Sequence, residues 1–209
     1  MPTDRKHGGR RRADAERNIE AIVAAALAEF CRNPGVSMTD IARAAGVGRV
    51  TLYGHFPSRE DLLDAVMARA IEDARATLGA VPTDGLPARD ALAALIRSAW
   101  QVLDRHRRLH AAAVQIIGPD RLREHHEQPL LLVEDLLDRG RRDGTVRADL
   151  PPHWLATTVY SMLHAAALEV DAGRLTSAGA ADVLEATLLP AISPVRQRDG
   201  GGRGPGDTA

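Results

Sequence analysis

The chain has 209 residues, of which 44% are hydrophobic and only 3% aromatic, and its formal net charge is −1. This length allows one medium domain or two small ones, and the few aromatic residues argue against a β-sandwich or barrel and for an all-α protein. The single cysteine excludes an intrachain disulfide. With neither an apolar run of membrane-spanning length nor a signal peptide, the sequence predicts a cytoplasmic protein.

Charge is distributed unevenly along the chain. Residues 1–59 contain 10 lysines and arginines against 6 aspartates and glutamates, a net charge of +4. Residues 60–209 contain 17 against 22, a net charge of −5. A basic front on an acidic remainder favours a DNA-binding head attached to a body that does not bind DNA.

The N-terminal segment divides into an arm and a helix. Residues 1–12 are polar, basic and glycine-containing, which predicts a flexible arm that could add affinity for DNA or remain a solvated tail. Apolar residues then recur at helical spacing and predict a helix over about 13–32. Asn33-Pro34-Gly35 ends that helix.

Two short helices are predicted next, over about 37–45 and 49–55. Ser37-x-x-Asp40 has the pattern of a capping box, which starts a helix. Gly46 can adopt the left-handed conformation that a sharp turn between helices requires. Helices this short are not stable alone, so they must pack on each other and on their neighbours.

Helical spacing continues through the rest of the chain. Ser58-x-x-Asp61 is a second capping box, and it opens a long helix that fades near Gly79. The segment 79–87 is the best candidate for a domain boundary, and 191–209 is too polar and glycine-rich to fold. Five further helices are predicted over 88–105, 107–117, 120–142, 152–172 and 177–189, for about nine in total.

The stretch from Ser37 to Phe56 and its flanks resembles the TetR family of regulators. The resemblance covers about residues 14–73 and is carried by Ile41-Ala42-x-x-Ala45-Gly46-Val47, Thr51-Leu52-Tyr53-x-His55-Phe56 and Pro57-Ser58-Arg59-Glu60-Asp61-Leu62-Leu63. It implies a three-helix head at 13–73 with a helix-turn-helix at about 37–56. A fourth helix would link this head to a regulatory and dimerisation domain at 74–190. The family function would be sequence-specific DNA binding, most often as a repressor that a small molecule releases.

Three positions depart from the family pattern. Gly48 stands where the family usually has serine, but glycine is nearly as good a helix cap. Arg59 replaces the common lysine, and both can bind a phosphate. Gly54 lies inside the expected recognition helix and costs about 1 kcal/mol in helix propensity.

The DNA-binding candidates follow from their positions in the helix-turn-helix. Amides and hydroxyls at a helix N-terminus favour a phosphate, and an arginine that opens the recognition helix can reach guanine. Tyr53, His55 and Arg59 resemble the family's phosphate-binding residues, although Tyr53 could equally be a core residue and Arg43 a solvated charge. The full set is Ser37, Thr39, Arg43, Gly48, Arg49, Val50, Thr51, Tyr53, His55 and Arg59.

The resemblance also implies a homodimer and an effector pocket. The last two helices, about 152–172 and 177–189, would pair with those of a second copy and place two heads on a palindromic operator. The effector is unidentified, and the apolar composition of residues 90–190 favours a mostly apolar small molecule. Pocket candidates are Trp100, Leu103, His110, Val114, Gln115, Leu131, Trp154, Thr158, Met162 and His164.

Two other kinds of protein remain as alternatives. An architectural DNA-binding protein without a ligand would also carry a basic helix-turn-helix. An enzyme or metal site could use the region that contains His106, His110 and Glu124-His125-His126-Glu127. However, this region has neither a recognisable catalytic motif nor metal-ligand spacing, so we expect no catalytic residues, no metal and no cofactor.

Overall fold

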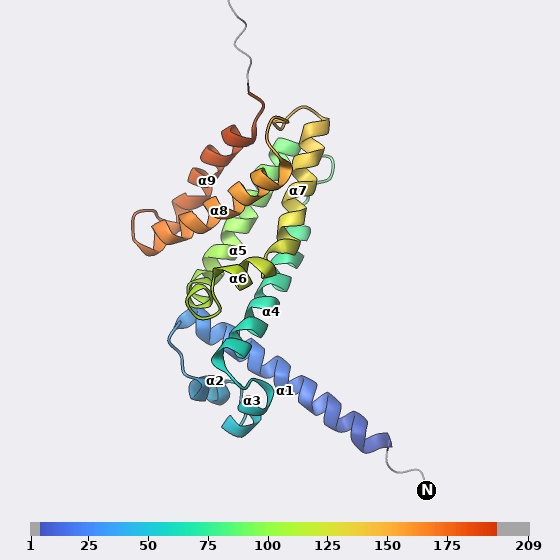
Figure 1. Cartoon of the computed structure of the whole chain (residues 1–209), viewed down its shortest axis with the longest axis vertical. Helices are drawn as coiled ribbons and strands as arrows, with labels where there is room; N and C mark the ends of the chain where they lie inside the picture. Colours follow the sequence, from blue (N-terminus) through green and yellow to red (C-terminus); the bar gives the residue numbers. More distant parts are fainter. Residues whose placement is uncertain (1–4, 196–209) are drawn as a thin grey trace, which may run out of the picture.

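The computed structural model describes residues 5–195, and within that range the chain forms nine α-helices and no strand. Figure 1 shows α1, α2 and α3 at one end, α5, α7, α8 and α9 packed together at the other, and α4 running between them. The expected all-α architecture, in which a fourth helix links an N-terminal three-helix head to a helical C-terminal part, is confirmed. The helices are α1 (Arg5–Arg32), α2 (Met38–Ala44), α3 (Arg49–His55), α4 (Arg59–Gly79), α5 (Ala88–Ile116), α6 (Pro119–His125), α7 (Glu127–Arg142), α8 (Pro152–Asp171) and α9 (Ser177–Ile192).

The turns around α2, α3 and α4 form as their sequence signals predict. Ser37 caps α2, and its side chain accepts a hydrogen bond from the backbone amide of Asp40 at 3.1 Å. Gly46 has φ of 69° in the turn to α3, where a residue with a side chain would be strained. Ser58 and Asp61 form the reciprocal capping box that starts α4.

A first apolar core holds the head together. It joins α1, α2, α3 and α4, and its fully buried members include Ile22, Phe30, Ile41, Leu52 and Leu62. The same core also takes in Leu109, Ala112, Ala113 and Leu122 from α5 and α6. The predicted boundary between residues 73 and 74 therefore does not divide the chain into two separate cores, because residues from both sides of it share the first core.

A second apolar core lies among α5, α7, α8 and α9. Trp100 is buried in it, and its indole Nε1 donates a hydrogen bond to the carbonyl of Ser177 at 3.0 Å. Gly140 lets α7 approach the following loop closely, because a Cβ atom there would lie 2.4 Å from Cγ2 of Val146. Leu137 and Leu184 are fully or almost fully buried at its centre.

The structure corrects three boundaries. Helix α1 begins at Arg5, so the prediction of an irregular arm is wrong for residues 5–12. The predicted helices 88–105 and 107–117 are one helix, α5, because no proline or glycine interrupts the backbone hydrogen bonds there. The predicted helix 120–142 breaks at His126, which places Pro129 in the first turn of α7, where a proline is tolerated. The predictions for residues 1–4 and 196–209 lie outside the described residues.

Candidate functional site

The recognition helix α3 presents a side-chain surface to solvent. Leu52 and Phe56 face the core, whereas Val50 is 88% exposed and Tyr53 is 42% exposed. Arg49 is exposed at the first position of the helix. The question left open for Tyr53 is thus resolved toward the surface, on the same helix as Arg49 and Val50.

The N-terminus of α2 carries a small polar network. The Ser37 hydroxyl donates to Oδ2 of Asp40 at 2.6 Å, and Nη1 of Arg43 donates to Oδ1 of Asp40 at 2.7 Å. The Ser37 hydrogen bond, followed by that of Arg43, lowers the pKa of the Asp40 carboxyl. The Arg43 side chain is 74% exposed, and its carboxylate partner, Asp40, lies on the same helix of the head. Thr39 lies half-buried beside them.

Arg59 serves the head itself. Its guanidinium donates to the carbonyls of Val36 and Pro34, the latter at 2.6 Å, and lies 4.8 Å from the centre of the Phe30 ring. Burial lowers the pKa of this guanidinium. These contacts fix the start of α4 to the loop between α1 and α2, so Arg59 positions the helix-turn-helix.

The remaining predicted residues surround the start and end of α3. Gly48 is its N-terminal cap and offers no side-chain hydrogen bond. A Cβ at Gly48 would come no closer than 3.8 Å to Thr51, so the glycine is not required by space. Thr51 and His55 are half-buried. The structure therefore leaves Arg49, Val50, Tyr53 and the partly exposed Thr51 and His55 available to a ligand of α3.

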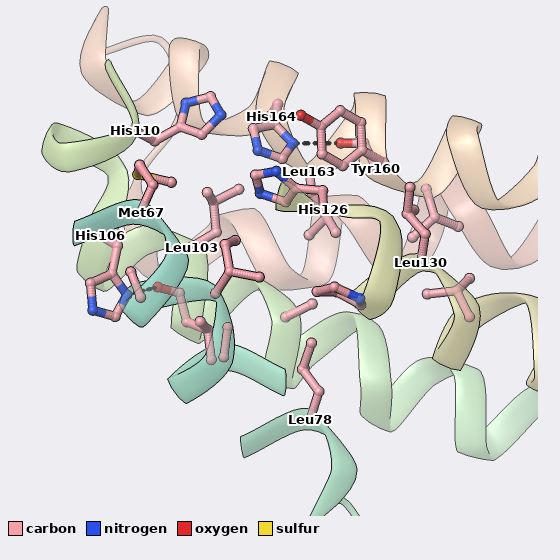
Figure 2. A pocket seen from close by; sticks show the side chains of 18 of the residues that line it. Met67, Leu78, Leu103, His106, His110, His126, Leu130, Tyr160, Leu163 and His164 are labelled. Atoms are coloured by element: carbon pink, nitrogen blue, oxygen red, sulfur yellow. Dashed lines mark hydrogen bonds between the residues drawn. The ribbon is translucent and has the colours of Figure 1, made fainter. Parts of the chain in front are cut away.

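A largely apolar pocket of about 110 Å³ lies between the head and the second core. Helices α4, α5, α7 and α8 all contribute to its walls, and Figure 2 shows their side chains converging on it. Its lining consists of Met67, Ala70, Ile71, Ala74, Leu78, Ala99, Val102, Leu103, His106, Leu109, His110, His126, Pro129, Leu130, Val133, Val159, Tyr160, Leu163 and His164.

Three of the ten predicted pocket residues line this cavity: Leu103, His110 and His164. The other seven lie elsewhere. Trp100 is a core residue and Met162 packs against that core. Thr158 donates to the carbonyl of Trp154 within α8, and Val114, Gln115, Leu131 and Trp154 are exposed.

The polar part of the pocket is a histidine cluster made of His110, His126 and His164, with Tyr160 beside it. The ring centres of His110 and His164 are 4.3 Å apart, those of His126 and His164 5.3 Å, and those of Tyr160 and His164 4.1 Å. His126 and Tyr160 were not predicted as pocket residues. The available signal was Pro129, because a proline is tolerated in the first turn of a helix and therefore predicts a helix start close to His126.

Burial keeps the histidine cluster neutral. It lowers the pKa of His110 to about 3 and that of His126 to about 4, with smaller contributions from neighbouring imidazoles, and it also lowers the pKa of His164. Nδ1 of His126 lies 2.8 Å from the carbonyl of Leu122, and Nδ1 of His164 lies 2.8 Å from that of Tyr160. Both Nδ1 atoms therefore donate, and the Nε2 atoms carry the lone pairs.

Within residues 5–195, no group of three or more histidine, cysteine, aspartate or glutamate side chains is arranged to hold a metal ion. In that same range, none of the helices has the length and apolar character needed to cross a membrane.

An exposed helix-turn-helix joined to a helical domain is the architecture of a DNA-binding transcriptional regulator. The family model for bacterial regulatory proteins of the tetR family matches residues 22–66. The repressor LfrR of Mycolicibacterium smegmatis is 32% identical over 163 residues, which cover 72% of this chain and 77% of LfrR. The chain therefore belongs to the TetR family of regulators.

Further relatives agree on the family and the fold. The repressor KstR2 of Rhodococcus jostii is 27% identical over 124 residues, covering 54% of this chain and 59% of KstR2. The crystal structure of LfrR from Mycobacterium smegmatis in complex with proflavine matches with a TM-score of 0.64 at 22% identity, covering 85% of this chain and 97% of that one. A TetR-family regulator from Rhodococcus sp. matches with a TM-score of 0.70 at 22% identity, over 85% and 100% of the two chains.

Proposed function

We propose that this protein is a cytoplasmic repressor that binds a palindromic operator as a homodimer and is released from it by a small molecule in the α4–α8 pocket. The observation that carries the proposal is that three buried residues belong both to the apolar core of the head and to the wall of the pocket. Met67, Ala70 and Leu109 are members of the head core and also line the pocket. A molecule that enters the pocket would therefore press directly on the packing of the DNA-binding head.

The surface of α3 supports major-groove binding. An arginine at the start of a recognition helix is placed to donate two hydrogen bonds to guanine, and Arg49 has that position. Val50, with 88% exposure and no core contact, could pack against a thymine methyl group. Tyr53 and His55 would bind the flanking phosphates.

The dimer would form through α8 and α9. Large apolar side chains are exposed on these two helices, with Trp154 at 56%, Leu168 at 66% and Val183 at 48%. A two-fold axis through such a face would place the two recognition helices about 34–36 Å apart or at a multiple of that spacing, as an inverted repeat requires.

Release would follow from the small size of the pocket. An engineered cavity of about 150 Å³ binds benzene, and this pocket measures about 110 Å³. We expect an effector that enters fully and exceeds this space to displace a wall, and α4 is the wall that carries the head. A coupling free energy of about 1–3 kcal/mol would lower operator affinity about 5- to 150-fold. The relative LfrR binds a small molecule, proflavine, in its crystal structure.

The first experiment is selection of binding sites from random duplex DNA at physiological salt. We expect an inverted repeat, and Arg49→Ala should reduce discrimination at one position of each half-site by about 1–3 kcal/mol. Arg75→Ala, in the exposed pair with Glu72 on α4, is the matched control. Binding that has no sequence preference and disappears steeply as salt rises would instead support the architectural alternative.

A further inference from the structure

The polar end of the pocket is chemically unusual because it consists of imidazoles. Among its described lining residues there is no aspartate, glutamate, lysine or arginine. Figure 2 shows His110, His126, His164 and Tyr160 grouped on one side, with Leu78 and Leu103 on the other. A ligand that fills this space would meet one hydrogen-bonding side and a mostly apolar remainder, to which His106 adds a single imidazole.

Two of these imidazoles have unused hydrogen-bonding atoms. The Nε2 atoms of His110 and His164 are buried and have no hydrogen-bond partner among the described residues. A buried polar atom without a hydrogen-bond partner lowers the stability of the folded protein by about 1–3 kcal/mol, so two such atoms require an explanation. Because Nδ1 of His164 donates to its own helix, Nε2 of this neutral ring is an acceptor, and it needs a donor from the ligand.

The carboxylates near the cluster are paired with other residues, whereas the guanidinium of Arg123 lies near Tyr160. On α4, Asp64 is bound by Arg121 and His125 of α6. On α5, Arg107 pairs with Asp104 and with Asp171 of α8, and the imidazole of His106 contacts the carbonyl of Val102. Arg123 of α6 lies 6.0 Å from the centre of the Tyr160 ring. None of these places a carboxylate beside the cluster.

We propose that the effector is a monocarboxylic acid with an apolar body, and that its carboxyl group binds at Nε2 of His110 and His164, within reach of His126. This proposal rests on the proposed function, in which the pocket receives the effector. A carboxylate that enters with one proton forms a neutral unit with an imidazole, whichever partner holds the proton. An organic cation would bring a charge that no carboxylate lining the described pocket could balance, and burying an unpaired charge is costly.

This pairing predicts proton uptake. The cluster is neutral and dissolved acid is ionised at pH 7, so binding takes one proton from solvent. The affinity should therefore fall up to about tenfold for each unit that pH rises above the acid's own pKa, until the pKa of the paired imidazole is passed. A neutral ligand of the same length should show no such dependence.

The test is isothermal titration calorimetry of the full-length protein with octanoate, 1-octanol and octylamine at pH 6, 7 and 8. Repeating each titration in two buffers of different ionisation enthalpy counts the protons taken up. At pH 6 we expect octanoate to bind about tenfold or more tightly than 1-octanol, the value of a hydrogen bond to a charged group, with uptake close to one proton. His164→Phe should remove that advantage and abolish the proton uptake, whereas His153→Phe, at an exposed position of α8, should change neither.

The outcomes separate this proposal from the proposed function. Equal or tighter binding of 1-octanol or octylamine, or octanoate binding without proton uptake, overturns the carboxylic acid assignment. The same holds if none of the three binds while another compound releases the operator, and the repressor then stands without this ligand class. Because proton uptake is measured on the unaltered protein, the result does not depend on the folding of His164→Phe.

Discussion

Asp64 connects the helix that carries the head to the helix that ends at the pocket. Its carboxylate accepts hydrogen bonds from Nε and Nη2 of Arg121, both at 2.8 Å, and from Nε2 of His125 at 2.9 Å. The Arg121 hydrogen bond, aided by His125, lowers the pKa of Asp64 from 3.8 to about 2. His125 is followed directly by His126, which lines the pocket, so the end of α6 connects the contact with α4 to the pocket wall.

The substitution Asp64→Asn removes the charge and nearly preserves the shape. A pKa lowered to about 2 corresponds to at most about 2.5 kcal/mol of stability. Because the Arg121 side chain is 60% exposed, solvent screening reduces this to about 1 kcal/mol. At pH 7 we therefore expect Tm to fall by about 2–4 °C. The stabilisation is complete above the unfolded pKa of about 4 and is lost as pH falls toward 2.

Urea and thermal unfolding at pH 7 measure this loss, with Asp73→Asn as the matched control. Asp73 lies on the same helix in an exposed pair with Arg69, which should contribute little. Fluorescence anisotropy with operator DNA then measures how far an effector lowers the affinity, and we expect a smaller factor in Asp64→Asn. If Asp64→Asn is no less stable than Asp73→Asn, the reasoning about α6 is refuted.

Three further predictions concern packing, assembly and pH. Gly140→Ala should lower the free energy of unfolding by about 1–3 kcal/mol, because the new Cβ would lie 2.4 Å from the Val146 side chain. Gly54→Ala in α3, whose Cβ would meet nothing within 4 Å, should raise the free energy of unfolding by up to about 1 kcal/mol. Urea unfolding measures both changes. Leu168→Arg should convert the proposed α8–α9 dimer to monomers in sedimentation or light scattering, while Leu131→Arg, 48% exposed on α7, should not. The histidine cluster is neutral in the folded protein and takes up protons on unfolding below about pH 6.5. The free energy of unfolding should therefore fall between about pH 6.5 and 4, by about 1 kcal/mol per histidine at pH 5.5. A urea midpoint that does not change over this pH range would contradict the prediction.

The helix-turn-helix could be predicted from the sequence because its signals are local. Ser37, Gly46 and Ser58 act within three or four residues of their own position, and each forms the cap or turn expected of it. The reciprocal half of the first box does not form, and the Asp40 carboxylate accepts from the side chains of Ser37 and Arg43. A short polar motif thus predicts the first residue of a helix more reliably than it predicts which atoms form hydrogen bonds there.

The pocket could be predicted only in part because it depends on contacts between distant helices. His110 and His164 lie 54 positions apart in the sequence, and periodicity does not show that their rings meet. Arg59 has a family-like position beside the head, yet it contacts the carbonyls of Val36 and Pro34, which no sequence pattern indicates. The share of α4 in the pocket was missed because a helix pattern identifies one apolar face and does not reveal that this face spans two cores.

The distribution of burial along α4 indicates how the two cores could be coupled. Its first half is anchored, since Leu62, Leu63, Val66 and Met67 are buried in the head core. Between Ile71 and Gly79 only Ala74 is buried, and the other side chains are exposed or partly exposed. Helix α5 contributes buried residues to both cores and cannot shift without disturbing them.

An effector that needs more space than the pocket offers would therefore displace the second half of α4 before it displaced α5. Because a helix transmits such a displacement along its axis, the first half of α4 would tilt together with the head that it anchors. Two heads tilted in opposite senses about a two-fold axis would no longer match the half-site spacing of an operator. If the proposed function holds, the few buried side chains of α4 beyond Ile71 would allow binding in the pocket to change the position of α3.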